Sequence, residues 1–418
     1  MRGTSEVDDE AGGADVEPAP APTLAAASAP TAVRPADRPL WLASLLAALP
    51  AWVIAHVLIL AMQEYAERRN PPFAAQMPGR EQIHHVFDAL FTWDTAWYSG
   101  IAEHGYSGVP SDGIRFWPLL PLTIRSLDLV GIGALTGALV VCWAASLAFG
   151  MLIYRVALAV GGDEPMAGRA AWLSQLAPGA FVLVMGYTEA LAGLLAAAFL
   201  ASILLTRPGA SPTARATWTW YAVGFVAGVG SGLVRPTGWL LCLAGLVEVV
   251  GNRRDRPSGM AARLAVAASP VLGLLIFLGW VKAEYHDLML PYSTQQAANL
   301  RGTTAANPFE SALESINQSG NGAGAFTLLL VIASIGLLWG SVRRLPVSFT
   351  VWALASLAAV ITAPHFSSFA RYSAGIIPLL LVAAMLTTRR SAWWWTVGCS
   401  AALCGYFAFQ SFIGIYIP

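Results

Sequence analysis

The sequence predicts an all-α membrane protein that crosses the bilayer many times. Hydrophobic residues make up 56% of its 418 residues and charged residues only 11%, and the mean hydropathy is +0.59. A chain with so few polar residues lacks the surface to cover a water-soluble globule. Apolar runs long enough to cross about 30 Å of hydrocarbon recur between residues 40 and 412. These observations together indicate the polytopic membrane class.

The first part of the chain has a different composition. Residues 1–37 are rich in Ala, Pro, Asp and Glu and show no periodic apolar pattern. Such a segment cannot bury enough apolar surface to fold, so we expect a disordered cytoplasmic tail. It lacks the basic stretch and short apolar core of a cleaved signal peptide. We therefore expect residues 38–418 to form a single transmembrane domain that begins with a retained first span.

The apolar runs predict about eleven transmembrane helices. They lie at residues 40–62, 132–156, 168–186, 188–206, 218–234, 236–251, 264–283, 325–342, 348–363, 371–388 and 392–412. If the N-terminus is cytoplasmic, arginines in six separate loops fall inside, as the positive-inside rule requires, and the C-terminus is extracytoplasmic. Lys and Arg total 24 and Asp and Glu total 24, so the charge balance indicates no nucleic-acid partner. No protein partner can be deduced.

Two outward segments are longer than ordinary turns, and long ordered loops in compact proteins tend to be functional. The first, 63–131, contains Phe116–Leu122, an apolar stretch broken by Pro118 and Pro121. Two prolines favour an interfacial or re-entrant element over a full span. The second segment, 284–324, ends in a Gly/Asn/Ser-rich stretch from Asn317 to Gly324, which is typical of a flexible loop or lid.

One carboxylate in the first loop lies among aromatic residues. In helical geometry Asp94, Trp97 and Ile101 share a face, which would set the carboxylate beside an apolar stripe at the membrane surface. A partly desolvated carboxylate there is suited to act as a general base. The same pattern is also typical of an amphipathic interfacial helix with solvated acids. This stretch alone leaves both interpretations open.

The order of motifs in this loop resembles the PIG-V family, the mannosyltransferases that add the second mannose of GPI anchors. Their first luminal loop reads approximately W-D, I-A-E-H-G-Y, F-F-P and P-L. The matching residues are Trp93-Asp94, Ile101–Tyr106, Phe116-Trp117-Pro118 and Pro121-Leu122. Weaker similarity follows at Arg235–Gly238 and at Arg371-Tyr372 with Pro378. Trp117 stands where the family usually has Phe. Outside these motifs the similarity is mostly hydrophobic.

The resemblance implies a GT-C glycosyltransferase fold and a polyprenyl or dolichyl phosphate mannose donor. By matching position, it makes Asp94 the general base for transfer to a lipid-linked or glycolipid acceptor on the extracytoplasmic face. The chemistry agrees, because an acceptor hydroxyl must lose a proton as it attacks the anomeric carbon, and an in-line displacement inverts that carbon. No cofactor is implied. The Ala-, Arg- and Trp-rich composition suggests a high-GC genome, so we expect a bacterial plasma membrane.

Further charged residues lie at the predicted outward ends of spans. A charge at membrane depth is expensive and often functional. Arg235 and Arg371 are suited to bind the donor phosphate bidentately, although snorkelling to the interface explains them as well. Glu189 either binds sugar hydroxyls or simply favours a helix N-terminus.

The remaining candidates belong to the first loop. Trp93, Glu103, His104 and Tyr106 are expected to bind substrate or to shape the loop. His104 beside Glu103 suggests a metal ligand, but no second cluster at ligand spacing follows, so we expect no metal site.

Two other classes of function remain open. A secondary transporter or lipid flippase also fits many helices with a few intramembrane charges. That class predicts inverted repeats and polar residues at mid-span, and neither is clear in this sequence. A non-catalytic scaffold would keep the hydropathy profile, but it would not require the aromatic, acidic and proline motifs in this order.

Overall fold

The computed structural model describes residues 38–69, 88–210, 213–253, 257–297, 306–317, 323–363, 366 and 368–416. The predicted tail at 1–37 and most of the predicted lid at 317–324 lie outside this part. Everything below concerns the unit Leu40–Pro418. Within its described residues the secondary structure is helical throughout, with no strand.

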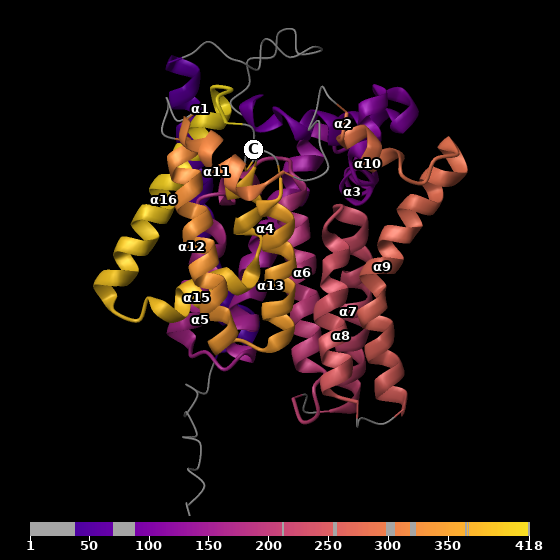
Figure 1. The fold of residues 1–418 in the computed structure, drawn as a ribbon, viewed down its shortest axis with the longest axis vertical. Helices are drawn as coiled ribbons and strands as arrows, with labels where there is room; N and C mark the ends of the chain where they lie inside the picture. Colours follow the sequence, from indigo (N-terminus) through magenta and orange to yellow (C-terminus); the bar gives the residue numbers. More distant parts are fainter. Residues whose placement is uncertain are drawn as a thin grey trace, which may run out of the picture. The chain divides into compact units, whose positions relative to one another are not determined.

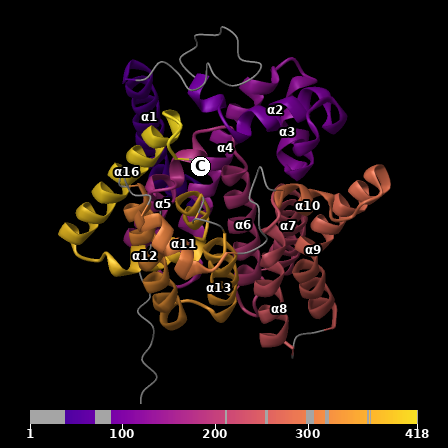
Figure 2. The same cartoon turned by 45° about the horizontal axis from the view of Figure 1, so that its top comes forward.

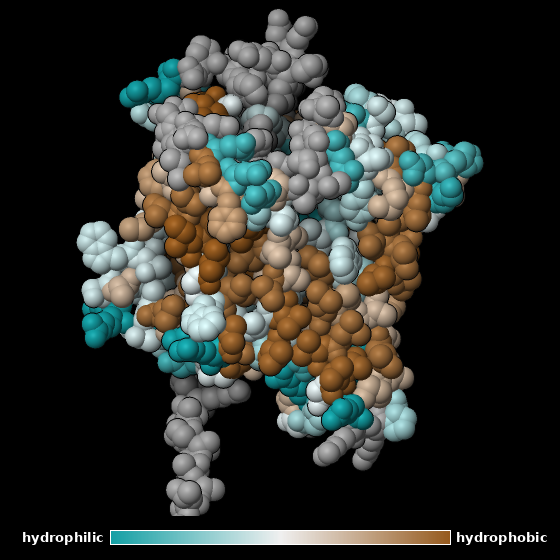
Figure 3. All heavy atoms as spheres, viewed as in Figure 1, coloured by the Kyte–Doolittle hydropathy of each residue, from teal (hydrophilic) through white to brown (hydrophobic). Residues whose placement is uncertain are grey.

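Five described helices are long and apolar enough to cross a bilayer. They are α1 (Leu40–Arg69), α4 (Ala134–Ala159), α6 (Thr188–Leu205), α9 (Pro257–Tyr285) and α12 (Ala323–Arg344). Figure 3 shows hydrophobic residues gathered in a band across the helices of one face, with hydrophilic residues toward both ends. The predicted class, an all-α integral membrane protein with many spans, is confirmed. The number eleven stays a prediction.

Six further described helices are shorter or less apolar than these five. They are α5 (Glu164–Leu176), α7 (Ala214–Val234), α8 (Leu241–Gly251), α13 (Val347–Ile361), α15 (Ile377–Leu386) and α16 (Arg390–Phe412). Helix α7 packs along α9 and against α6, while α1 packs against α4, α5 and α16 (Figure 1).

Two of the predicted spans are interrupted helices. The run 168–186 begins inside α5, which ends at Leu176 before Pro178-Gly179, and continues through a 3-10 turn, η5 (Ala180–Leu183). The run 371–388 divides into α14 (Phe369–Ala374) and α15. Pro178 supplies no backbone N–H to continue α5, whereas Pro378 lies in the first turn of α15, where no such bond is needed. Interrupted helices at membrane depth require cover from other protein segments. Gly179, in the first break, lies against Ala370 and Arg371 of α14, beside the site described below.

The described part of the first long loop is a chain of short helices. They are η2 (Asp88–Phe91), α2 (Asp94–His104), η3 (Tyr106–Gly108), η4 (Ser111–Arg115) and α3 (Leu119–Asp128). Helices α2 and α3 lie side by side at one end of α4, as Figure 2 shows. From the second loop, α10 (Leu290–Gln295) packs against η4, and α11 (Pro308–Asn317) packs against α12.

A partly buried ion pair lies beyond the far end of α6. Arg207 follows the helix and binds both carboxylate oxygens of Glu248 in α8, at 2.5 Å to Oε1 and 3.0 Å to Oε2. The Ser348 hydroxyl of α13 donates to Oε1 at 2.7 Å. Asn252 Nδ2 donates to Oε2 at 3.3 Å. We call these four residues the Glu248 cluster. It ties α8 and α13 to the end of α6.

Candidate active site

Asp94 is the first residue of α2, and its backbone position is set by an unusual turn. Trp93, the residue before it, has φ of 59° and ψ of −126°, a conformation that costs a bulky residue about 1–3 kcal/mol. Two contacts hold this turn: the Trp93 indole N–H donates to the Ser411 carbonyl at 3.3 Å, and the Asp94 N–H donates to the Tyr187 hydroxyl at 3.4 Å. The strain is therefore compensated by tertiary contacts that place the Asp94 carboxylate.

Asp94 is the first member of an alternating chain of charges. Arg371 Nη1 donates to Asp94 Oδ2 at 2.8 Å. The same guanidinium donates through Nε to Glu189 Oε1 at 2.6 Å. Arg235 Nη2 then donates to that Glu189 oxygen at 3.1 Å. We call Asp94, Arg371, Glu189 and Arg235 the Asp94 cluster. Its two acids and two arginines have no formal net charge.

Burial differs sharply along this cluster. The side chains of Glu189 and Arg371 are 3% and 5% exposed, whereas that of Asp94 is 27% exposed. Glu189 Oε2 is buried and accepts no hydrogen bond from the described residues. Buried charges are normally paired and hydrogen-bonded. Asp94 is thus the acid of the cluster that an incoming molecule can reach, and it is paired with the buried guanidinium of Arg371.

Close backbone contact positions Arg371. A Cβ on Gly179 would lie 1.7 Å from the Ala370 carbonyl oxygen and 2.5 Å from the Arg371 nitrogen. Only glycine allows this approach of the segment after α5 to α14. The Pro178-Gly179 break of the predicted span 168–186 was visible in the sequence, but its partner was not.

Aromatic rings surround the arginines. Arg371 lies over the Tyr187 ring, with its Cζ 4.6 Å from the ring centroid. The centroid of the Tyr372 ring lies 5.1 Å from the Cζ of Arg371 and 5.0 Å from the Cζ of Arg235. Rings in these positions attract cations and shield them from water. The sequence interpretation missed Tyr187 and Gly179. Tyr187 lies two residues before Glu189, and Gly179 directly follows Pro178. Such proximity in the sequence is too weak a signal to identify a site residue without the fold.

Two tyrosines facing Asp94 stay neutral. Burial, and then the negative charge of Asp94, raises the pKa of both Tyr98 and Tyr187 well above its ordinary value. A phenol with a raised pKa remains protonated at physiological pH. Tyr98 and Tyr187 therefore add hydroxyl groups to the site but no second negative charge.

The structure places the predicted site residues in two groups. Asp94, Glu189, Arg235 and Arg371 come together, with Trp93 adjoining. Glu103 and His104 lie at the other end of α2, exposed and 3.5 Å from each other. Within the described residues, no group of three or more His, Cys, Asp and Glu side chains is arranged to hold a metal ion.

Tyr106 anchors the loop away from the cluster. Its hydroxyl donates to the Phe116 carbonyl at 2.7 Å, and its ring lies 5.0 Å from that of Trp280 in α9. Trp117, at the position where the PIG-V motif usually has Phe, is buried and meets Phe277 edge-on at 4.3 Å. These aromatic contacts fix the first loop on α9.

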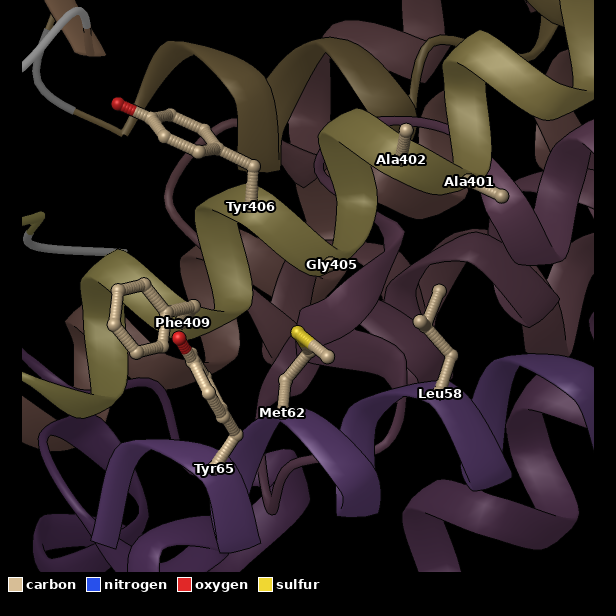
Figure 4. A pocket seen from close by; sticks show the side chains of 8 residues that line it. All are labelled: Leu58, Met62, Tyr65, Ala401, Ala402, Gly405, Tyr406 and Phe409. Atoms are coloured by element: carbon tan, nitrogen blue, oxygen red, sulfur yellow. The ribbon is translucent and has the colours of Figure 1, made fainter. Parts of the chain in front are cut away.

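A separate apolar groove of about 430 Å³ lies between α1 and α16. Figure 4 shows Leu58, Met62 and Tyr65 of α1 facing α16, with the Tyr65 ring beside that of Phe409. The two rings are 5.3 Å apart. The lining of the groove includes no residue of the Asp94 cluster, so we treat the groove and the cluster as distinct.

No protein-family model matches the chain, and no curated protein matches it. Among solved structures, it is similar to an Archaeoglobus fulgidus oligosaccharyltransferase tethered with an acceptor peptide, at 13% identity and a TM-score of 0.47 over 88% of this chain and 55% of that one. It is also similar to ArnT from Cupriavidus metallidurans bound to undecaprenyl phosphate, at 18% identity and a TM-score of 0.47 over 72% of this chain and 56% of that one.

The chain thus covers little more than half the length of these two proteins. At such identities and TM-scores, their fold family and activities are not carried over to it. The resemblance to the PIG-V family stays a prediction.

Proposed function

We propose that this chain is a membrane glycosyltransferase of the GT-C type. It would take a sugar from a polyprenyl phosphate, mannose by resemblance to the PIG-V family, and pass it to a lipid-linked or glycolipid acceptor. The observation that supports this most is the position of the Asp94 carboxylate. It is 27% exposed and paired with the buried Arg371, and it lies where α2 meets the ends of the apolar helices. A water-accessible acid there is within reach of lipid-linked sugars.

The arrangement suits a single inverting displacement. Asp94 takes the proton of the acceptor hydroxyl, whose oxygen forms a bond to the anomeric carbon. The bond from that carbon to the phosphate oxygen breaks, and the polyprenyl phosphate leaves with the electron pair. Arg371 binds Asp94 Oδ2, and no described residue donates a hydrogen bond to Oδ1, which can therefore take the proton. A β-linked donor gives an α-linked product.

The arginines have different parts in this proposal. Arg371 donates to both acids and acts mainly as a positioning residue for Asp94. Arg235 makes a hydrogen bond through Nη2 alone within the described residues. Its other N–H groups are suited to donate hydrogen bonds to a phosphate oxygen of the leaving group, which needs such donors rather than a general acid.

The test is transfer of radiolabelled mannose from polyprenyl phosphate mannose by membranes that contain the wild type, Asp94→Asn or Asp128→Asn. Asp128 ends α3 in the same loop, and within the described residues its side chain makes no ion pair or hydrogen bond. We expect Asp94→Asn to lower transfer about 10²- to 10⁴-fold and Asp128→Asn to match the wild type. Equal transfer by all three removes the base, and lipid movement without transfer would favour a flippase.

A further inference from the structure

The Asp94 cluster has no charge left over for an anionic substrate. Asp94 and Glu189 are each paired with Arg371, and Glu189 also with Arg235. A phosphodiester brings one further negative charge, and taking an uncompensated charge out of water is costly. A donor phosphate at this site therefore needs a cation from outside the cluster.

Arg115, the last residue of η4, is such a cation. Its side chain is half-buried, and no described carboxylate lies within ion-pair distance of it. Its Nε is buried and has no hydrogen-bond partner among the described residues. Among the same residues, no hydrogen bond is seen for the terminal Nη atoms either. This guanidinium is partly removed from water, and no negative charge in the described structure compensates the loss of hydration.

Two stacked rings hold the guanidinium in place. The Trp97 and Phe116 rings are stacked at 5.4 Å, and Arg115 Cζ lies 4.7 Å from the Phe116 centroid and 5.7 Å from the Trp97 centroid. Stacking on aromatic faces leaves the edge of a guanidinium open for bidentate hydrogen bonds. By contrast, Arg125 of the same loop donates to the Ala102 carbonyl at 3.3 Å.

The position of Arg115 relative to Asp94 suits the leaving group. Trp97 lies one helical turn from Asp94 on the same face of α2, so the helix that carries the base also carries one of the two rings that support Arg115. In an in-line displacement the base and the leaving phosphate lie on opposite sides of the anomeric carbon. Arg371, 2.8 Å from Asp94, is on the side of the base.

We propose that Arg115 binds the phosphate of a lipid-linked phosphate substrate, with Trp97 and Phe116 as its aromatic support. The inference rests on the proposed function, in which that lipid is the sugar donor. The same N–H edge would also accept the phosphate of an ordinary phospholipid headgroup, so the experiment must separate the two sources.

The experiment measures binding of polyprenyl phosphate to the full-length protein in nanodiscs of neutral phosphatidylcholine, by native mass spectrometry. It compares the wild type with Arg115→Gln, Arg115→Lys and the loop control Arg125→Gln. Loss of a charged hydrogen-bonding partner should weaken binding about tenfold to a hundredfold in Arg115→Gln. We expect smaller weakening in Arg115→Lys, which keeps the charge but not the fork, and a change under about twofold in Arg125→Gln.

Unchanged binding in both Arg115 variants would overturn the proposal. So would equal competition by phosphatidylglycerol, because the site would then be one for phospholipid headgroups in general. Since binding is read without transfer, Arg115-dependent binding by a protein that transfers no sugar would refute the proposed function and leave this site standing.

Discussion

The two ends of α6 carry clusters of the same residue types in different states. At one end, both oxygens of Glu248 accept hydrogen bonds from Arg207, and Ser348 donates to Oε1 as well. At the other end, Glu189 has a buried oxygen with no partner among the described residues, and Asp94 uses one oxygen only. Helix α6 runs from Thr188 to Leu205, about 27 Å at 1.5 Å per residue. This length is close to the roughly 30 Å thickness of a hydrocarbon layer.

The difference separates a structural ion pair from a candidate site. A carboxylate whose oxygens are all occupied holds helices together but has little capacity for a ligand. A carboxylate with a spare oxygen and access to water retains such capacity. We therefore assign stability to the Glu248 cluster and chemistry to the Asp94 cluster.

The largest effect on stability is expected from Arg371→Met. This change leaves Asp94 and Glu189 without the cation that joins them, and breaking a buried pair costs about 3–5 kcal/mol. Arg207→Met should cost less, because Arg207 is 36% exposed and Ser348 still donates to Glu248. Thermal unfolding in detergent micelles measures both. Equal losses would mean that the two clusters do not differ in burial as described.

Gly179→Ala tests how the Asp94 cluster is positioned. The new methyl group would overlap the Ala370 carbonyl, so α14 must move and carry Arg371 away from Asp94. We expect at least about tenfold lower transfer, since small misplacements of catalytic groups are costly. Gly168→Ala in α5 is the matched control, because a Cβ there meets nothing within 4 Å. Normal transfer by Gly179→Ala would show that this backbone contact is not needed.

Ser348→Ala sharpens the assignment at the other end. It removes one donor to Glu248, and a hydrogen bond to a charged group is worth about 1.5–3 kcal/mol. The melting temperature should fall while transfer per folded molecule stays at the wild-type value. A loss of transfer without a loss of stability would give the Glu248 cluster a functional part.

The smallest effect is expected from Glu103→Gln. Glu103 is exposed and forms an ion pair with His104, and exposed pairs contribute about 0–1 kcal/mol. Transfer and melting temperature should both match the wild type. A marked loss of transfer would mean that the Glu103-His104 pair takes part in the function, as the sequence motif suggested.

Hydropathy predicted the membrane class and the long apolar helices but not where the helices end. The first apolar run, predicted at 40–62, lies within α1, which continues to Arg69. Its last turns are polar and are supported by hydrogen bonds along the helix, from Gln63 to Glu67 at 3.0 Å and from Arg68 to Glu64 at 2.8 Å. Side-chain pairs four residues apart stabilise a helix without adding hydrophobicity, so a search for apolar runs stops too early.

The charged residues of the site could be named from the sequence, but their union could not. Arg371 lies 277 residues from Asp94 and 182 from Glu189 along the chain. Each was notable because charge at membrane depth is expensive. That the arginines would pair with these acids depends on the packing of α6 and α14, which no local pattern encodes. Glu103 is the opposite case. It belongs to the sequence motif, but the fold places it on the surface at the other end of α2.

The central claim is tested most directly by transfer per folded molecule in Asp94→Asn and Glu248→Gln, measured side by side. Asp94→Asn should remain folded, since Glu189 still compensates Arg371, and should lose transfer by about 10²-fold or more. Glu248→Gln should melt at a lower temperature, yet its folded fraction should transfer at the wild-type rate. The account is contradicted if the folded Glu248→Gln protein loses transfer while Asp94→Asn retains it.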